Sequence, residues 1–428
     1  MRRPQAWLLA ALAAVIVGPA DVPSAQARLS RLFQLDAFRV VGAARYSSAD
    51  VVKLSGLTIG ARVSAADLDR AARRMASTGL FSKVVFAYTT IGTQLTVTFT
   101  IEEARWTMPV TYDNFVWFSD SDIVTALRVM IPTFDGMAPE TPGMPELLTR
   151  SLQALLAARQ IAGRVEFRPQ GTVGKGLDRY DFRVVDPSPS ICELRFPGAA
   201  AIPEAQLAAA LKAGGGSDYS RSYLTRASDG TLGDMYRRQG RWAVAIGPPR
   251  AAAATGCDGV TVTMPIDEGA VYSWSGVEWH GHRAMSVSEL DQVLGLEPGR
   301  TAELGPLRDG IRRVELVYER QGYITRGLTY VPRLDPAGHR LAVVVTVEEG
   351  PQFRMGTVEF LGATPALVDA LSRRWRLAEG DVYDGTYARD FLSQEIVPRL
   401  PGGAHAPQLD IMLDAGAKRV SVRVRFAG

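Results

Sequence analysis

The sequence has little of the chemistry that enzymes and metal sites usually need. Its 428 residues include two cysteines and four histidines. His280 and His282 stand two residues apart, but neither a cysteine nor a third ligand lies at a spacing that zinc could use. The sequence has no GxSxG motif, and the Gly-Gly-Gly-Ser run at 214–217 lacks the GK[ST] ending of a phosphate-binding loop. We therefore expect no catalytic residue, no cofactor and no metal site.

An excess of one charge and long apolar runs are missing too. Forty-eight basic residues face 45 acidic ones, which gives a net charge of +3 without a long basic run. This balance argues against nucleic acid as a partner. Beyond the N-terminus, no stretch approaches the 18 uninterrupted apolar residues that a membrane-spanning helix requires. We expect no transmembrane segment once the N-terminal segment is removed.

The N-terminus is typical of a secretory signal peptide, at residues 1–27. Arg2 and Arg3 precede an apolar run at 6–17, and Ala25-Gln26-Ala27 fits the small-x-small cleavage motif. The run is short for a bilayer, which favours cleavage over a retained anchor. In an exported protein, Cys192 and Cys257 could pair or remain as two buried thiols.

A five-residue pattern occurs five times along the chain. Two apolar side chains alternate with polar ones, and a turn residue follows at 42, 114, 198, 281 and 362, so successive copies lie 72 to 84 residues apart. The turn residue is Gly four times and Asn114 once, and these two types accept positive φ most easily. The period predicts small domains in tandem. Their expected bounds are 28–104, 105–188, 189–270, 271–351 and 352–428.

Within each copy the pattern predicts strand, helix, helix, strand and strand. In the first copy, Ser48 and Ser64 are expected to cap helix starts, and 84–88 and 95–101 alternate as strands. The second copy is interrupted by prolines and glycines over 132–145, which predicts a loop. The fold class is α+β, with two helices covering one face of each three-stranded sheet. The acidic pairs Glu102-Glu103 and Glu348-Glu349, and the similar Asp267-Glu268, are expected to be solvated strand ends.

The unit, its glycine after the first strand and its terminal acidic pair resemble the polypeptide-transport-associated (POTRA) domain, over residues 37–428. The first, fourth and fifth copies resemble it most. In that family such arrays lie in the periplasm before an outer-membrane β-barrel, where they receive unfolded barrel proteins and dock accessory subunits. Here the chain stops at Gly428 with no residues for a barrel. The resemblance therefore implies the binding module without the barrel.

The implied function is a non-catalytic periplasmic scaffold or chaperone-like protein, associated with the outer membrane, in outer-membrane protein assembly or export. Its partners would be unfolded or extended outer-membrane protein clients, bound by β-augmentation. One alternative is a structural adaptor that docks a separately encoded outer-membrane β-barrel and binds no client. The other is an envelope or division protein that an uncleaved N-terminal helix anchors to the membrane.

In this family the second strand lies at a sheet edge, and it corresponds here to 83–88 in the first copy and 324–331 in the fourth. The candidate partner-binding residues are Val84, Val85, Phe86, Tyr88, Ile324 and Tyr330. Residues 84–88 hold neither proline nor charge, which usually blunt natural edges. A neighbouring domain or a second copy of the chain could also cover this edge. The family's first and last strands are parallel neighbours, so the resemblance implies a Cys192–Cys257 disulfide.

Overall fold

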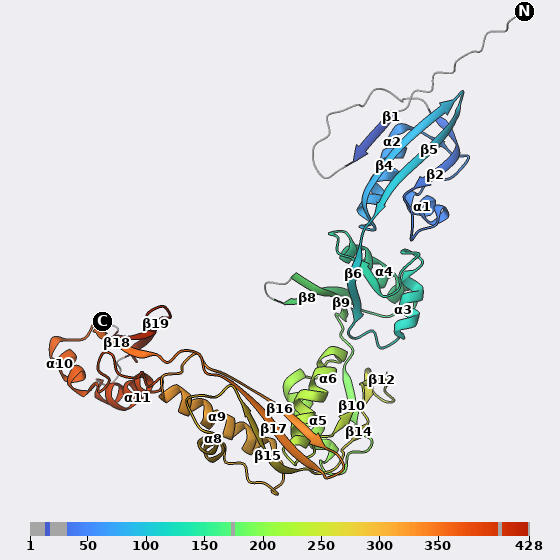
Figure 1. The fold of residues 1–428 in the computed structure, drawn as a ribbon. Coiled ribbons are helices and arrows are strands. Elements are labelled where there is room, and N and C mark those ends of the chain that lie inside the picture. The colour runs from blue at the N-terminus through green and yellow to red at the C-terminus, as the bar shows by residue number, and fades with distance from the viewer. Residues whose placement is uncertain (1–12, 18–31, 173–175, 401–404, 427–428) are drawn as a thin grey trace, which may run out of the picture. The chain divides into compact units, whose positions relative to one another are not determined.

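The computed structural model describes residues 13–17, 32–172, 176–400 and 405–426 (Figure 1). The predicted signal peptide falls largely outside these ranges, and so does its expected cleavage site. The chain divides into two compact units. One contains Met1–Arg195, Lys212–Thr225 and Pro249–Thr263, and the other contains Phe196–Leu211, Arg226–Pro248 and Met264–Gly428. The third predicted domain contributes to both units, and the five predicted boundaries stay a prediction.

The first region folds as expected, with two helices and a sheet. Its helices begin at capping boxes in which Ser47 pairs with Asp50 and Ser64 pairs with Asp67. The prediction that Ser48 caps the first helix is wrong, because Ser47 makes the bonds of the cap and Ser48 is the first helical residue. The sheet order is β1-β4-β5-β2-β3. The elements are β1 (Ala13–Val17), β2 (Phe33–Val41), α1 (Ser48–Ser55), β3 (Arg62–Val63), α2 (Ala65–Ser77), β4 (Phe81–Ile91) and β5 (Gln94–Glu103).

The second region has the sheet order β7-β6-β9-β8. The loop predicted over 132–145 contains a short strand instead, and the next helix begins inside it with proline in its first turn. The elements are β6 (Trp106–Tyr112), α3 (Asp120–Leu127), β7 (Met137–Pro139), α4 (Met144–Ala158), β8 (Arg164–Thr172) and β9 (Gly176–Val185).

The third region forms two small sheets, β10-β13-β12 in the first compact unit and β11-β14 in the second. Its helical part is broken into short pieces, with a π-helical turn at Ser228–Leu232. The elements are β10 (Ile191–Arg195), α5 (Glu204–Gly215), α6 (Arg221–Ala227), α7 (Gly233–Arg237), β11 (Ala245–Ile246), β12 (Arg250–Ala253), β13 (Val260–Thr263) and β14 (Ile266–Asp267).

The last two regions repeat one strand order, β15-β17-β16 and β18-β20-β19. Figure 1 shows α8 and α9 beside the first of these sheets. The fourth region has β15 (Ser273–His280), α8 (Val287–Leu294), α9 (Leu304–Arg320), β16 (Gly327–Asp335) and β17 (Arg340–Glu348). The fifth has β18 (Arg354–Leu361), α10 (Pro365–Arg374), α11 (Tyr387–Phe391), a π turn (Leu392–Ile396), a 3-10 turn (Val397–Arg399), β19 (Gln408–Asp414) and β20 (Arg419–Arg425).

The core of each sheet lies on one face, as the alternation predicted. The buried residues of β17 are Leu341, Val343, Val345 and Val347, two apart along the strand. Leu307, Ile311, Val314 and Tyr318 of α9 belong to the same cluster. Five times in the part of the chain that the structure describes, the last strand lies between the first strand, which is parallel to it, and the second, which is antiparallel. The α+β class predicted from the sequence is confirmed.

Candidate partner-binding site

The candidate site is the outer side of β4, which lies at the opposite side of the sheet from β2. Ile91 pairs with Gln94 across a two-residue turn in which Gly92 has a φ of 62°. In such a hairpin the pair that flanks the turn exchanges both backbone hydrogen bonds, and the bonds alternate from there. Thr89, Ala87 and Val85 therefore direct their N–H and C=O groups to β5.

Tyr88, Phe86 and Val84 direct the same groups to the opposite side, away from β5. The side chains of Val84 and Phe86 are buried at 1% and 3% exposure, and Tyr88 packs partly against the same core. These three residues can therefore meet a partner through the backbone. Val85 is half-buried on the other face of the strand. Three of the four predicted residues of β4 can thus offer backbone hydrogen bonds to a partner. The fourth, Val85, can offer only its side chain.

The expectation that β4 is an edge strand is wrong in the described chain, because β1 occupies its outer side. β1 pairs with it in the antiparallel direction, and the register joins Ala13 to Tyr88, Val15 to Phe86 and Val17 to Val84. Figure 1 shows β1 beside β4 on the side away from β5. A segment of the chain itself can thus pair with the backbone groups on this side of β4.

The fourth region offers a poorer edge. β16 is the outer strand of its sheet and holds the half-buried Tyr330, but Pro332 removes one donor and Arg333 adds a charge. The prediction that Ile324 lies on this strand is wrong. Ile324 stands three residues before β16 in a turn, where it packs against the core of the fifth region. Ile324 therefore belongs to the contact with the next sheet.

An edge that the sequence analysis missed lies in the fifth region. β19 is the outer strand of its sheet, and it exposes three successive apolar side chains, Ile411 (43%), Met412 (37%) and Leu413 (47%). Successive residues of a strand point to opposite faces, so both faces of β19 carry exposed apolar groups. The run Ile-Met-Leu between Asp410 and Asp414 breaks the usual alternation, and this break was the available signal.

The second acid of each terminal pair has a partner, contrary to the expectation of solvated strand ends. Glu349 Oε1 accepts the N–H groups of Arg283 and Ala284, at 2.6 and 2.8 Å, and the hydroxyl of Tyr318 at 3.1 Å. Burial alone would raise the pKa of Glu349, but these donors and the Arg283 charge outweigh it and hold the pKa below its usual value. The carboxylate therefore fastens the loop after β15 to the end of β17.

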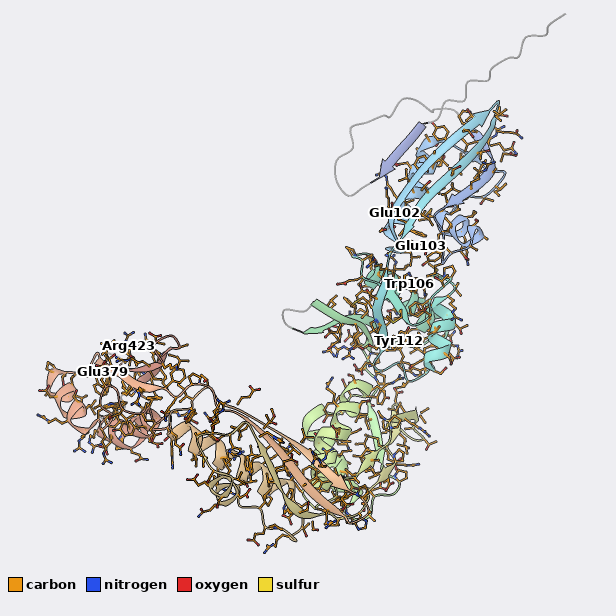
Figure 2. All side chains as sticks on the ribbon, viewed as in Figure 1. Glu102, Glu103, Trp106, Tyr112, Glu379 and Arg423 are labelled. Atoms are coloured by element: carbon orange, nitrogen blue, oxygen red, sulfur yellow. A yellow bond between two sulfur atoms is a disulfide. The ribbon has the colours of Figure 1, made fainter. Side chains whose placement is uncertain are left out.

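The same clasp occurs in two other regions. Glu268 accepts the N–H groups of Ala200 and Ala201 at 2.7 and 2.8 Å. Glu103 accepts those of Ala44 and Arg45, both at 2.8 Å. Figure 2 shows Glu102 and Glu103 at the end of β5, just before Trp106. The first acid of the pair stays exposed, and Glu102 pairs with Lys83.

The second region departs from this scheme at Asn114. The expectation that Asn114 takes positive φ like the glycines is wrong, because it is absent from the positive-φ residues of the described chain. Its buried side-chain amide instead donates to the C=O of Val184 at 2.8 Å and accepts the N–H of Val184 at 2.6 Å. The Asn114 side chain thus forms hydrogen bonds across the sheet that the backbone forms in other regions.

Cys192 and Cys257 are joined in a disulfide, with Cα atoms 6.5 Å apart. Cys192 lies in β10 and Cys257 lies three residues before β13, and these strands are parallel neighbours. The separation falls in the range that a disulfide accepts.

The described residues also bear on metal sites, membrane-spanning helices and pockets. They contain no group of three His, Cys, Asp or Glu side chains placed to hold a metal ion. Within the same ranges no helix has the length and apolar character to cross a bilayer. A hollow of about 550 Å³ beside α1 and α2 is lined by Arg70, Arg73 and Arg74, but the first two are paired with Asp67 and Asp69.

Comparison with known proteins identifies the fourth region. The sequence model of the POTRA family, described as "Surface antigen variable number repeat", matches residues 272–350. The "Putative outer membrane protein assembly factor" of Treponema pallidum (strain Nichols) is 25% identical over 180 residues, which are 40% of this chain. The match covers 22% of that relative, so the chain spans about a fifth of its length.

The comparison also matches solved structures of low sequence identity. POTRA domains 3–5 of BamA from Haemophilus influenzae are 18% identical with a TM-score of 0.41, and the match covers 56% of this chain and 96% of that one. POTRA domains 1–3 of Omp85 from Anabaena are 16% identical with a TM-score of 0.26, and the match covers 56% and 94%. The match at residues 272–350 identifies the fourth region as a POTRA domain, and the fifth region repeats its strand order.

Proposed function

We propose that this chain is a non-catalytic scaffold of outer-membrane protein assembly or export that works in the periplasm and is associated with the outer membrane. It would bind extended client chains by adding them as a strand to β4. We also propose that residues 28–104, 105–188, 189–270, 271–351 and 352–428 form five POTRA-like domains. The name of the Treponema pallidum relative supports the role in assembly, and the edge of β4 supports the mechanism.

The observation that carries the proposal is the pairing of an added strand on β4. Backbone groups of Val84, Phe86 and Tyr88 supply the ladder, so affinity depends little on the client's sequence. Residues 84–88 carry neither charge nor proline, which are the usual protections of an edge. A protein that handles many clients needs such tolerance.

The test uses residue 88, because its N–H points to the partner and its side chain is only partly buried. Tyr88→Pro removes this donor while the β5 ladder keeps its own bonds. Tyr88→Ala is the matched control, because it loses the side chain and keeps the donor. Both variants are made in residues 28–428, and far-ultraviolet circular dichroism and thermal unfolding check that they fold.

Binding of fluorescent ten-residue peptides from outer-membrane barrel strands is measured by anisotropy. We expect Tyr88→Pro to bind about tenfold more weakly than Tyr88→Ala, since one lost hydrogen bond corresponds to roughly 1.4 kcal/mol. Equal affinity of a folded Tyr88→Pro variant and its alanine control would show that clients do not pair with this edge.

The second candidate function is the adaptor that docks a separately encoded barrel. The exposed Ile411, Met412 and Leu413 on β19 favour it, because apolar side chains on both faces of an outer strand suit a stable protein contact. Crosslinking in the native envelope from position 412 separates the two functions. One uniform partner at stoichiometric yield supports the adaptor, and a mixture of barrel precursors at position 88 supports the scaffold.

A further inference from the structure

The strand that occupies the β4 edge comes from the predicted signal peptide. β1 covers residues 13–17, which lie in the apolar run at 6–17 and before the expected cleavage after Ala27. Its five residues pair in antiparallel register with 84–88 without a bulge. The segment that export would remove is therefore the one that pairs with the proposed client edge.

β1 takes the positions that the proposed function gives to a client. By the alternation from the hairpin, the outward backbone groups belong to Val84, Phe86 and Tyr88, and their partners are Val17, Val15 and Ala13. These are the pairs that exchange hydrogen bonds in an antiparallel ladder. A client and β1 cannot hold this ladder at the same time.

The sequence of β1 suits this edge. Ala-Ala-Val-Ile-Val has no charge and no proline, and its last three residues are β-branched, the type that favours strands. The β4 segment from 84 to 88 is likewise uncharged and free of proline. The match indicates which chemistry the edge accepts, namely a short uncharged segment rich in β-branched residues and antiparallel to β4.

We propose that the signal segment caps the β4 edge in the precursor and that its removal opens this edge to clients of the same chemistry. The opening of this edge to clients rests on the proposed function, whereas the capping itself does not. A segment tethered to its own site acts at about millimolar effective concentration. If the free segment binds with a Kd of about 0.1 mM, capping weakens client binding roughly tenfold.

The first experiment compares purified chains of residues 1–428 and 28–428 in the peptide assay. We expect the shorter chain to bind client peptide about tenfold more tightly, as the tethered concentration requires. Val15→Pro in the longer chain removes the donor that faces Phe86 and is expected to restore binding. Ala10→Pro, in the same apolar run but outside β1, is the matched control and leaves binding weak.

A second experiment tests the register without any client. Ile16 and Val85 face each other in a pair that does not exchange hydrogen bonds, where Cα atoms lie about 4.5 Å apart. Ile16→Cys with Val85→Cys should form a disulfide on mild oxidation, since this distance suits one. Ile16→Cys with Ala87→Cys is offset by two residues and should crosslink far less. Both pairs are made with Cys192 and Cys257 replaced by serine.

The outcomes separate the two proposals. Equal client binding by 1–428 and 28–428 would overturn capping and leave the proposed function intact. Failure of Val15→Pro to restore binding, or equal crosslinking of the two cysteine pairs, would overturn it too. If 28–428 binds no client while the in-register pair crosslinks selectively, capping stands and the client function of β4 fails.

Discussion

Gly281, at the end of the first strand of the fourth region, lies against the carbonyl oxygen of Val347 in the last strand. A Cβ on Gly281 would be 2.2 Å from that oxygen, and the residue has a φ of 77°. Gly42 and Gly198 have the same relationship to Ile101 and Ile266, at 2.2 and 2.1 Å. The glycine that punctuates the sequence pattern therefore serves both a turn and a close approach of two strands.

We expect Gly281→Ala to destabilise the fourth region by about 3 kcal/mol or more, because the left-handed conformation and a backbone clash both oppose a side chain. Gly299→Ala is the control, since Gly299 has a φ of 85° but nothing within 4 Å of a Cβ. It should cost only about 1–2 kcal/mol. Hydrogen exchange over residues 273–348 measures both changes, and similar protection losses would contradict the role of Val347.

Glu349→Gln should weaken the clasp on the loop after β15 by about 1–3 kcal/mol at pH 7, since a charged acceptor is lost. The pKa of Glu349 is lowered from its ordinary value of 4.5, so the unfolded chain binds more protons below that pH. The stability that this carboxylate provides is present above pH 4.5 and is lost as the pH falls through the lower folded pKa.

The difference in unfolding free energy between the parent and Glu349→Gln should therefore be largest at neutral pH and smaller in acid. Calorimetric unfolding at pH 7 and pH 3 measures it. Glu348→Gln, at the exposed neighbouring position, is the matched control and should differ little from the parent at either pH. A difference in unfolding free energy that stays constant with pH would contradict the clasp.

The disulfide between Cys192 and Cys257 should stabilise the third region by about 2–4 kcal/mol, because it closes a loop of 65 residues. Reduction, or replacement of both cysteines by serine, should shift thermal unfolding of this region to lower temperature. Replacement of one cysteine should give the same loss plus a titratable thiol. Peptide mapping of the protein without reductant that recovers two free thiols would contradict the bond.

The alternating strands and the glycine turns could be predicted from the sequence because each depends on neighbours within one strand or turn. β17 and α9 bury the apolar residues that their periodicity marks. Ile324 shows the limit, because its partner is the core of the next region. A residue at a joint between sheets has an apolar side chain like any strand residue, and local spacing does not distinguish the two.

The glutamate clasps lay beyond sequence reasoning for a related reason. Adjacent acids on a strand point to opposite faces, which correctly separates Glu102 from Glu103. This rule does not identify the loop, 58 residues away, whose N–H groups donate hydrogen bonds to Glu103. At Asn114 a side-chain amide makes the hydrogen bonds across the sheet. The sequence analysis considered the tolerance of asparagine for positive φ, whereas its hydrogen-bonding amide is the property that matters here.

Asp113 joins the second region to the start of α6 and provides the last prediction. Its buried carboxylate accepts the N–H of Ser222 at 2.7 Å and the hydroxyl of Ser220 at 2.8 Å, and its own C=O accepts the N–H of Arg221. The first amides of a helix have no partner within it, so Asp113 satisfies a donor that Ser222 would otherwise leave free.

Asp113→Ala should remove both side-chain bonds and raise hydrogen exchange at residues 221–225 by about ten- to a hundredfold, which corresponds to roughly 1.4–2.8 kcal/mol. Asp120→Ala is the control. Asp120 also contacts Arg221, at 2.9 and 3.0 Å, but its side chain is 61% exposed, and exposed pairs contribute about 0–1 kcal/mol. Asp113→Asn keeps one acceptor and should fall between them. If Asp120→Ala loosens this segment as much as Asp113→Ala does, the joint depends on the surface ion pair and not on the buried carboxylate.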